Sequence, residues 1–528
     1  MPTPEDYLIL AAYAIGFAFA LVFCALPLLG ILQQQGYSNR TYLRWFYRNR
    51  NAHLWRYAIF ACSLLLLVTL TSLAFSFAGV RASNLAGALV FLAVCGVFVY
   101  AFRKALKVPL RRTRRLIRLA VCFFVVLFGV SFGCGIGFHY AAELIDSDLA
   151  RILRLIPFAT LPLFLPLLLA LSNLIMKVYE LPRNRNLIWR ARKKLEKSNC
   201  VKVGITGSFG KTSVKLATAA MLSKKYKVIA TPSSYNTPIG IARTINENGL
   251  DCDIFLAEMG ARYMGDIAEL CDLVRPDVGL VTGVCPQHVS TFGSLENIRT
   301  EKGVLAKRAG KVVLGESVKD MKKEGALVEG EDFAAEDVVL TPQETRFTLR
   351  IGKERFPVVT KILGRHAAQD IALAAALCYA LGMSGEEIAS AVPDVKPIPH
   401  RLERMEGNGV NILDDSYNSN VLGAEDAVEI LKLFGGRKYV VTPGLVELGD
   451  IERPENEKLG ASFVDLDAVI LVGETLVLPV RDGYLKAGGD DRKLRIVQDL
   501  KAAQKILAAE LEEGDSVLFL NDLPDKFM

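Results

Sequence analysis

Five apolar stretches without a single Lys, Arg, Asp or Glu occupy most of the first 180 residues. They are residues 8–32, 58–80, 85–102, 119–139 and 155–176. A helix of about 20 apolar residues crosses a bilayer, because backbone polar groups in lipid must pair within their own segment. A soluble helix of this length would carry a charged face, and these stretches have none. The pattern therefore predicts a transmembrane region of five helices in residues 1–180.

The charges between these stretches predict how the helices are oriented. Residues 34–57 carry five Arg and no acid, residues 103–118 carry eight Lys or Arg and no acid, and residues 177–197 carry eight against two Glu. The start of the chain and the segment 140–150 are acidic instead. Because basic loops stay in the cytoplasm, we expect the N-terminus outside and everything after residue 177 inside. This is the pattern of a multi-pass protein of the cell membrane.

Charge also separates the two parts of the chain. Residues 1–197 have a formal charge of +17, and the remaining 331 residues have −10. A net acidic soluble part argues against nucleic acid as a partner. The basic loops are expected to face anionic membrane lipids or a lipid-linked pyrophosphate. The ten cysteines form no C-x-x-C pair, so neither disulfides nor a zinc site are predicted.

A phosphate-binding loop is predicted directly after the membrane region. The apolar run from Val201 to Ile205 reads as a buried strand, and a helix-forming segment follows from Ser213 to Lys224. Glycines between them allow backbone N–H groups to turn inward toward a phosphate, next to the positive end of the helix. The glycine spacing differs from that of the common P-loop, because Ile205 stands where the first glycine would be. The residues predicted to bind a nucleoside triphosphate here are Gly207, Ser208, Phe209, Gly210, Lys211, Thr212 and Ser213.

Strands alternate with helical segments through the rest of the chain. The first strands are expected at 227–231, 253–258, 278–282 and 311–314, followed by a hairpin at 345–360 and a helix at 367–381. A second series is expected at 410–414, 438–442, 468–472, 494–498 and 516–520. This alternation predicts mostly parallel sheets covered by helices. We expect a central ATP-binding domain over 198–395, a Pro-rich linker near 393–399, and a Rossmann-like α/β domain over 400–528.

Two side chains are expected at strand ends, where such folds place their ligands. Glu258 closes a buried strand and is a natural Mg²⁺ partner opposite the loop, although a glutamate taken alone at such a place more often caps the loop that follows. His288 comes after the strand at 278–282 and is expected at the same edge. A single histidine is more often structural than a ligand, so its role depends on its neighbours.

Several motifs together resemble the Mur ligase family. They are similar to the branch that joins D-alanyl-D-alanine to the UDP-MurNAc-tripeptide. The matching segments are Gly-Ile-Thr-Gly-Ser-Phe-Gly-Lys-Thr-Ser at 204–213, Glu-Met-Gly-Ala-Arg-Tyr-Met-Gly-Asp at 258–266, Pro-Gln-His at 286–288, Glu-Lys-Gly at 301–303, Gly-Arg-His at 364–366 and Asp-Asp-Ser-Tyr-Asn at 414–418. They follow the family order and span roughly residues 198–450.

The resemblance implies an ATP- and Mg²⁺-dependent amide ligase, an acid–amino-acid ligase that acts through an acyl phosphate. Lys211, His288 and Lys302 would then be catalytic. Thr212, Glu258, His288 and Lys302 would hold Mg²⁺, with Lys302 carbamylated. His366, Arg401 and Asp415 would reach the nucleotide, and Asn236, Arg262, Tyr417 and Asn418 would face the substrates.

Three departures from the family pattern bear on the substrates. The domain that grips the UDP-sugar in the family is missing, and the membrane stretches stand in its place. The family's His-Asn-x-x-Asn near the adenine is His366-Ala367-Ala-Gln-Asp370, and the Lys-Gly-Ser end is absent. We therefore expect a lipid-linked or polymeric cell-envelope precursor, joined to an amino acid or short peptide, in peptidoglycan or related synthesis.

Three alternatives remain open at this point. The chain could be a membrane-bound synthase of a γ-linked amino-acid polymer, an ATPase coupled to transport, or a nucleotide-sensing scaffold. A transport ATPase has no need of the second α/β domain with its Asp-Asp-Ser-Tyr-Asn segment. Ala367 favours the scaffold somewhat.

Overall fold

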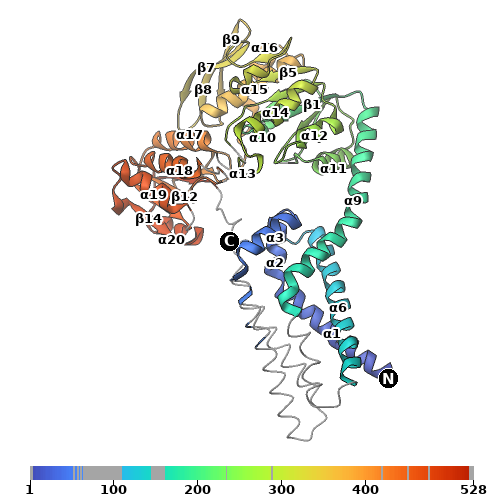
Figure 1. Cartoon of the computed structure of the whole chain (residues 1–528). Helices are drawn as coiled ribbons and strands as arrows, with labels where there is room; N and C mark the ends of the chain where they lie inside the picture. The colour runs from blue at the N-terminus through green and yellow to red at the C-terminus, as the bar shows by residue number, and fades with distance from the viewer. Residues whose placement is uncertain are drawn as a thin grey trace. The chain divides into compact units, whose positions relative to one another are not determined.

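The structure is a computed structural model that describes most of the chain (Figure 1). The described residues are 4–51, 54–55, 59, 62, 110–143, 161–233, 235–286, 289–417, 420–446, 448, 451–473 and 476–521. They belong to two compact units, Met1–Arg183 and Asn184–Pro524.

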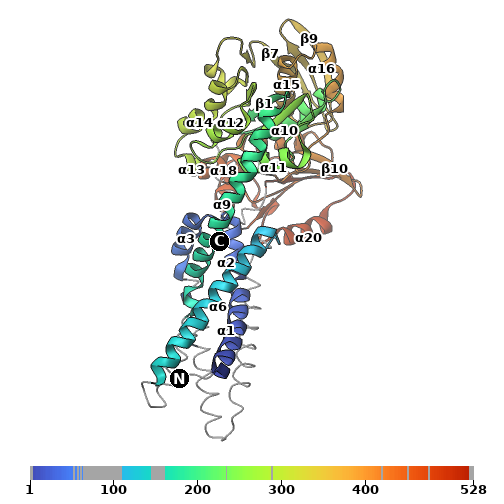
Figure 2. The same ribbon diagram turned by 90° about the vertical axis from the view of Figure 1, so that its right-hand side faces the viewer.

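The first unit is helical. Its described helices are α1 (Pro4–Cys24), α2 (Leu26–Gln34), α3 (Asn39–Arg48), α6 (Arg114–Glu143), the 3₁₀ turn η1 (Leu161–Phe164) and the first part of α9 (Leu165–Lys197). Helices α1 and α6 run side by side (Figure 2), and the hydroxyls of Tyr7 and Tyr140 are 3.0 Å apart. An apolar core formed by α1, α2, α6 and α9 holds this unit together.

Two of the described helices are long and apolar enough to span a membrane, Arg114–Gly137 and Leu161–Lys197. Helices α1 and α2 count as a third span if the bent pair Ala14–Cys24 and Leu26–Gln34 is taken as one. The predicted stretches 58–80 and 85–102, and residues 155–160 of the last, lie outside the described residues apart from Ile59 and Cys62. The number five therefore stays a prediction.

Two sequence expectations for this region were wrong in detail. The stretch 8–32 is two helices that meet at a 50° bend, with Pro27, which has no N–H to donate, in the first turn of α2. The basic segment 177–197, expected as a loop, continues α9 past Pro182. It stays helical because Ala191 and Leu195 pack into the core of the second unit.

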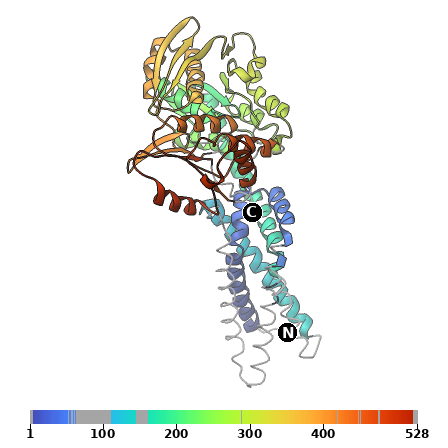
Figure 3. The ribbon, with the colours of Figure 1, turned by 90° about the vertical axis from the view of Figure 1, so that its left-hand side faces the viewer.

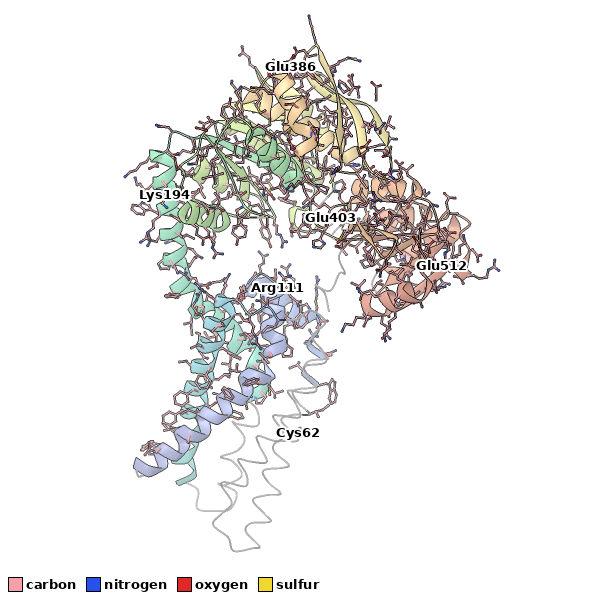
Figure 4. The ribbon with its side chains drawn as sticks, turned by 180° about the vertical axis from the view of Figure 1, so that it is seen from behind. Cys62, Arg111, Lys194, Glu386, Glu403 and Glu512 are labelled. Carbon is pink, nitrogen blue, oxygen red and sulfur yellow. The ribbon has the colours of Figure 1, made fainter. Side chains whose placement is uncertain are left out.

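The second unit begins with a parallel six-stranded sheet in the order β2-β3-β1-β4-β5-β6. The strands are β1 (Val201–Thr206), β2 (Val228–Ala230), β3 (Ile254–Glu258), β4 (Val278–Val281), β5 (Lys311–Leu314) and β6 (Leu327–Val328). One face is covered by α10 (Lys211–Leu222) and α15 (Arg365–Ala380). The other is covered by α11 (Pro238–Asn248), α12 (Asp266–Val274), α14 (Leu295–Arg308) and the end of α9. In Figure 4 Lys194 marks this end of α9, and its ammonium donates to the Asn246 carbonyl of α11 at 3.2 Å.

Helix α14 packs unusually close to this sheet. A Cβ atom on Gly204 of β1 would lie 3.0 Å from Leu305 Cδ1, and one on Gly279 of β4 would lie 2.8 Å from Ala309 Cβ. Real Cβ contacts are rarely this short, so a side chain at Gly279 would meet the fixed Cβ of Ala309, whereas one at Gly204 would displace the flexible ends of Leu305 and Met259. The lack of a side chain at Gly204 and Gly279 thus allows α14 to lie close to β1 and β4, the strands that end at the candidate site.

A three-stranded antiparallel sheet adds to the α15 side of this domain. Its strands are β7 (Phe333–Leu340), β8 (Thr345–Ile351) and β9 (Glu354–Thr360), drawn in yellow in Figure 3. The expected hairpin is β8 and β9, with Gly352 at a positive φ of 59° in the turn. Shorter helical segments nearby are α13 (Val289–Phe292), η2 (Glu316–Met321), α16 (Gly385–Ala391) and η3 (Val392–Asp394).

The C-terminal part is a second six-stranded sheet in the order β10-β11-β15-β12-β13-β14, parallel except for β10. Its strands are β10 (Glu403–Gly407), β11 (Val410–Asp415), β12 (Lys438–Thr442), β13 (Ala468–Val472), β14 (Leu494–Val497) and β15 (Ser516–Leu520). Helices α17 (Val421–Lys432), α18 (Glu452–Ala461) and α19 (Val477–Lys486) cover one face, and α20 (Leu500–Glu510) covers the other. A short turn, η5 (Asp491–Lys493), precedes β14. The sequence predicted two α/β domains after the membrane region, and the second unit contains both.

Candidate functional site

The predicted phosphate loop connects β1 to α10. Gly210 stands just before α10 in the left-handed conformation (φ 69°), which lets the chain turn sharply into the helix. The Lys211 ammonium folds back over the loop and donates to the carbonyls of Gly207 at 2.7 Å and Ser208 at 3.2 Å. Burial lowers the pKa of Lys211, and the positive charge of Arg401 lowers it further. The loop thus carries a cation over its own backbone, at the start of a helix.

Glu258 lies at the centre of a buried polar cluster beside this loop. Its side chain is 1% exposed. The Oε2 atom accepts hydrogen bonds from the Thr212 hydroxyl at 3.0 Å and the Lys215 ammonium at 2.9 Å, and Oε1 accepts one from the Asn236 amide at 3.1 Å. Strand β3, helix α10 and the segment after β2 therefore meet at one carboxylate.

Thr212 and Glu258 fit the requirements of Mg²⁺. Both offer oxygen, the ligand type that this ion prefers, and Mg²⁺ at nucleotide sites is commonly held by one or two protein oxygens plus phosphate oxygens. No group of three or more His, Cys, Asp or Glu side chains suited to a metal occurs among the described residues. His288, the third expected ligand, lies outside the described residues.

Lys302 is buried in α14, with 3% of its surface exposed. Burial lowers its pKa to about 7, and the positive charge of Lys211 adds to the effect. The neighbouring Glu301 has a separate task, because its carboxylate accepts the backbone N–H groups of Gly265 and Ile267 at the start of α12. Lys302 therefore presents a substantial fraction of unprotonated amine at neutral pH.

A cavity of about 120 Å³ opens beside the phosphate loop, between the two α/β domains. Three of the predicted nucleotide-binding residues, His366, Arg401 and Asp415, line it together with Phe209 and Gly210 of the loop. The full lining is Phe209, Gly210, Ser213, Ala217, Ile362, Leu363, His366, Ala367, Asp370, Ile371, Ile398, Arg401, Leu402, Asp415, Tyr417, Asn420, Gly423 and Asp426.

Two acids in this cavity shape its electrostatics. The Asp426 carboxylate accepts the backbone N–H groups of Arg365 and His366, both at 3.0 Å, and lies 3.1 Å from His366 Nδ1. Burial alone would lower the pKa of His366, but the hydrogen bond and charge of Asp426 raise it above its usual value. Asp370 packs against Gly210, where a Cβ atom would clash with its carboxylate. The cavity thus holds a carboxylate directly against the phosphate loop.

The predicted substrate residues are distributed less tightly. Asn236 belongs to the Glu258 cluster. Tyr417 lines the nucleotide cavity, with the Arg401 guanidinium 5.1 Å from the centre of its ring. The Arg262 side chain is exposed, and Asn418 lies outside the described residues. Roles for all four in substrate binding remain predictions.

Sequence reasoning missed Lys215 and Asp426. Lys215 follows Lys211 by one helical turn, and it is flanked by Val214 and Ala217 on the buried side of α10. That spacing was a usable signal, because a lysine on an apolar helix face needs a buried partner. Asp426 gave no local signal, since it meets His366 across 60 residues of chain.

Comparison with known proteins matches both α/β domains. Residues 205–378 match the Mur ligase middle domain, and residues 400–521 match the Mur ligase, glutamate ligase domain. A UDP-N-acetylmuramoyl-tripeptide–D-alanyl-D-alanine ligase of Mycobacterium bovis is 31% identical over 352 residues, which cover 60% of this chain and 69% of the relative. The enzyme of the same name from Escherichia coli is 29% identical over 52% of this chain and 64% of its own length.

Solved structures of MurF ligases are also similar to this chain. The MurF ligase of Thermotoga maritima in complex with ADP superimposes with a TM-score of 0.58 at 27% identity, covering 65% of this chain and 81% of that one. MurF from Acinetobacter baumannii has the same fold, with a TM-score of 0.58 at 22% identity over 64% of this chain and 78% of its own.

Proposed function

The chain belongs to the Mur ligase family, and we propose that it forms an amide bond at the cytoplasmic face of a membrane. It lies on the branch of the UDP-N-acetylmuramoyl-tripeptide–D-alanyl-D-alanine ligases and is thus an ATP-dependent amide ligase. The observation that carries this proposal for the site is the contact between Thr212 and Glu258. It brings two oxygen ligands together at the start of α10, beside the phosphate loop. The product would be a component of the cell envelope.

The proposed reaction has two steps. An oxygen of a substrate carboxylate attacks the γ-phosphorus of ATP, and the bond to the bridging oxygen breaks to release ADP. The amine nitrogen of the second substrate then attacks the acyl carbon, phosphate leaves, and the nitrogen loses a proton. Such chemistry depends mainly on positioning and on neutralising phosphate charge.

The residues are assigned to these steps by their surroundings. Lys211 would turn from the loop carbonyls to the β- and γ-phosphates of ATP, while Thr212 and Glu258 would hold Mg²⁺, which neutralises phosphate charge. His366, Arg401 and Asp415 would contact the nucleotide in the cavity. His288 is assigned to the metal by resemblance alone, and Arg262, Tyr417 and Asn418 are assigned to the substrates in the same way.

We propose further that Lys302 is carbamylated. Carbamate forms when an unprotonated amine adds to CO₂ and releases one proton, so a lysine pKa near 7 favours the reaction at neutral pH. The modification replaces a cation beside Lys211 with an anion. That anion would supply a further oxygen ligand for Mg²⁺.

The substrate is proposed to be lipid-linked or polymeric. The family models match only residues 205–378 and 400–521, which leaves the basic, apolar N-terminal region free to act on a membrane. Its net charge of +17 over residues 1–197 suits a pyrophosphate-bearing lipid better than it suits a neutral polymer. The five-helix topology with the N-terminus outside is part of this proposal, as are the domain limits 1–180, 198–395 and 400–528.

The test is phosphate release by the full chain in detergent, with ATP, Mg²⁺ and D-alanyl-D-alanine. Muramoyl-tripeptide is offered either on UDP or on a polyprenyl pyrophosphate. We expect release to require both substrates and to favour the lipid-linked acceptor. Lys211→Ala should reduce turnover by roughly 100-fold or more, because it removes the cation on the transferred phosphate.

Lys224→Ala is the matched control, since this exposed lysine lies just beyond α10 and pairs only with Asp394 at the surface. Its turnover should equal that of the wild type. Preference for the UDP-linked acceptor would refute the lipid-linked substrate and leave the ligase assignment intact. Full turnover in Lys211→Ala would refute the role given to the phosphate loop.

A further inference from the structure

Lys215 is the most deeply buried cation in the described part of the site. It has 0% exposure and forms an ion pair with Glu258 at 2.9 Å. Its ammonium also donates to the carbonyl of Ser233 at 2.5 Å. Ser233 lies three residues before Asn236, the residue whose amide holds the other oxygen of Glu258. Lys215 therefore connects α10, the end of β3 and the segment after β2.

The charge of Lys215 is needed because Glu258 is buried. An isolated carboxylate in a protein interior is strongly unfavourable, and hydrogen bonds from neutral groups such as Thr212 and Asn236 only partly compensate. Among the described residues, the Lys215 ammonium is the only positive group within hydrogen-bond distance of Glu258. It acts on the same oxygen, Oε2, as the Thr212 hydroxyl.

We infer that Lys215 is a positioning residue that serves as the counter-charge of Glu258 and keeps its carboxylate aimed at Thr212 whether or not a divalent cation is bound. The inference rests on the proposed metal role of Glu258. It adds an internal cation that shares the carboxylate with the metal, and it connects Ser233 and Asn236, on the proposed substrate side, to metal binding.

This role has a consequence that packing alone would not have. If Lys215 is replaced by Met, which has a similar length and no charge, the carboxylate of Glu258 loses its counter-cation and keeps only the neutral hydrogen bonds of Thr212 and Asn236. A divalent cation then supplies the positive charge that Lys215 supplied, so the variant should gain more stability from Mg²⁺ than the wild type gains. A ligand that binds only the folded state stabilises it according to its concentration and affinity.

The experiment measures thermal unfolding of the full chain in detergent, with ADP present and MgCl₂ varied from none to 10 mM. Lys215→Met should melt roughly 5–10 °C below the wild type without Mg²⁺, as expected when one partner of a buried ion pair is removed. Added Mg²⁺ should recover at least about half of this loss, and should raise the wild-type Tm by less. Lys224→Met, at an exposed site, should behave as the wild type does.

The double variant Lys215→Met/Glu258→Gln removes both charges and completes the cycle. It should melt within a few degrees of the wild type and should not respond to Mg²⁺ beyond the response of Glu258→Gln. If Lys215→Met fails to fold, recovery of folding in the double variant supports the inference by itself. A double variant that melts no higher than Lys215→Met, or a Mg²⁺ response of Lys215→Met equal to that of the wild type, would overturn it. A wild type that MgADP does not stabilise would instead refute the proposed nucleotide site.

Discussion

Among the side chains of the site, Lys302 has the surroundings least suited to an ammonium ion, because it is buried and repelled by Lys211. If its carbamate is a metal ligand, Lys302→Ala should lower ligase turnover by roughly 100-fold. Acetate should restore part of the activity by placing a carboxylate in the vacated space. Turnover by the wild type should also fall in degassed buffer without bicarbonate.

Lys307→Ala is the control for Lys302, because Lys307 is exposed on the same helix. It should show normal turnover and no response to acetate. An alanine variant of Lys302 with wild-type turnover would exclude the metal role.

Asp370 predicts a pH dependence of nucleotide binding. Burial raises its pKa to about 6; His366, Arg401 and a hydrogen bond from Ser213 lower it, and Glu329 raises it slightly. Lys211 on α10 also faces it. Above pH 6 the group is mainly an anion next to the phosphate loop, and below pH 6 it is mainly neutral. Nucleotide phosphates should therefore bind more tightly as the pH falls through 6.

Replacing this carboxyl with an amide should remove the effect. Asp370→Asn should bind ADP about tenfold more tightly than the wild type at pH 8 and about equally at pH 5, if the bound phosphates raise the pKa of Asp370 by about one unit, because one pKa unit corresponds to a factor of ten. Titration calorimetry at both pH values gives the comparison, and the exposed Asp394→Asn controls for net charge. Equal affinities at pH 8 would show that Asp370 does not face the phosphates.

At the scale of single residues, the sequence identified those site residues that belong to short, contiguous motifs. The phosphate loop follows β1, and Glu258 closes β3, both as expected; the helix after the loop begins at Lys211, two residues earlier than expected. Lys215 and Asp426 were not identified, because their importance comes from partners 43 and 60 positions away in the sequence. Such pairings appear only once the chain is folded.

Among the secondary-structure elements, α12 depends on a residue of α14 for its start. The first backbone N–H groups of a helix lack partners within the helix, and Glu301 accepts those of Gly265 and Ile267 at 2.8 and 2.6 Å. Glu301→Ala would leave both donors without this partner, and the N–H of Ile267 would be buried and unpaired. We expect a loss of about 3 kcal/mol and a Tm lower by roughly 6–10 °C.

Glu301→Gln keeps one acceptor oxygen and should lose about half as much. The exposed Glu324→Ala should leave the Tm unchanged. If Glu301→Ala melts like the wild type, water rather than Glu301 satisfies the start of α12.

Some secondary-structure elements were predicted from the sequence and others were not. Buried parallel strands such as β3 and β13 were found because their apolar runs end at clear turns. Strands β7 and β10 were not predicted, because their exposed faces carry polar and charged residues and hide the alternation. The second half of α9 was taken for a loop because its high charge outweighed the helical spacing of Leu187, Ala191 and Leu195.

For the whole molecule, the decisive prediction is topology. If the basic loops orient the helices, an epitope tag at Met1 should be accessible from outside intact cells. A tag at Ser198, directly after α9, should be accessible only after the membrane is permeabilised. Antibody labelling before and after permeabilisation distinguishes the two, and equal accessibility at both positions would refute an odd number of crossings.

At this scale the sequence predicted the two α/β domains, because strand and helix periods survive in a single sequence. It predicted five membrane helices from hydropathy, and the described residues, which leave out two of the five stretches almost entirely, contain two candidate spans or three. Hydropathy records length and polarity, but not bends such as the one between α1 and α2.

The close approach of α14 to the sheet has a consequence for genetics. Gly204 and Gly279 do not line the cavity beside the phosphate loop, yet a larger residue at Gly279 would push on Ala309, and one at Gly204 would push on Met259 and Leu305, next to the helix that carries Lys302. In a saturation mutagenesis screen, Gly279 should tolerate almost no substitution, and Gly204 should tolerate only small residues. Intolerance to substitution alone would suggest that these glycines take part in catalysis, although their role is to leave room for the side chains that pack between α14 and the sheet.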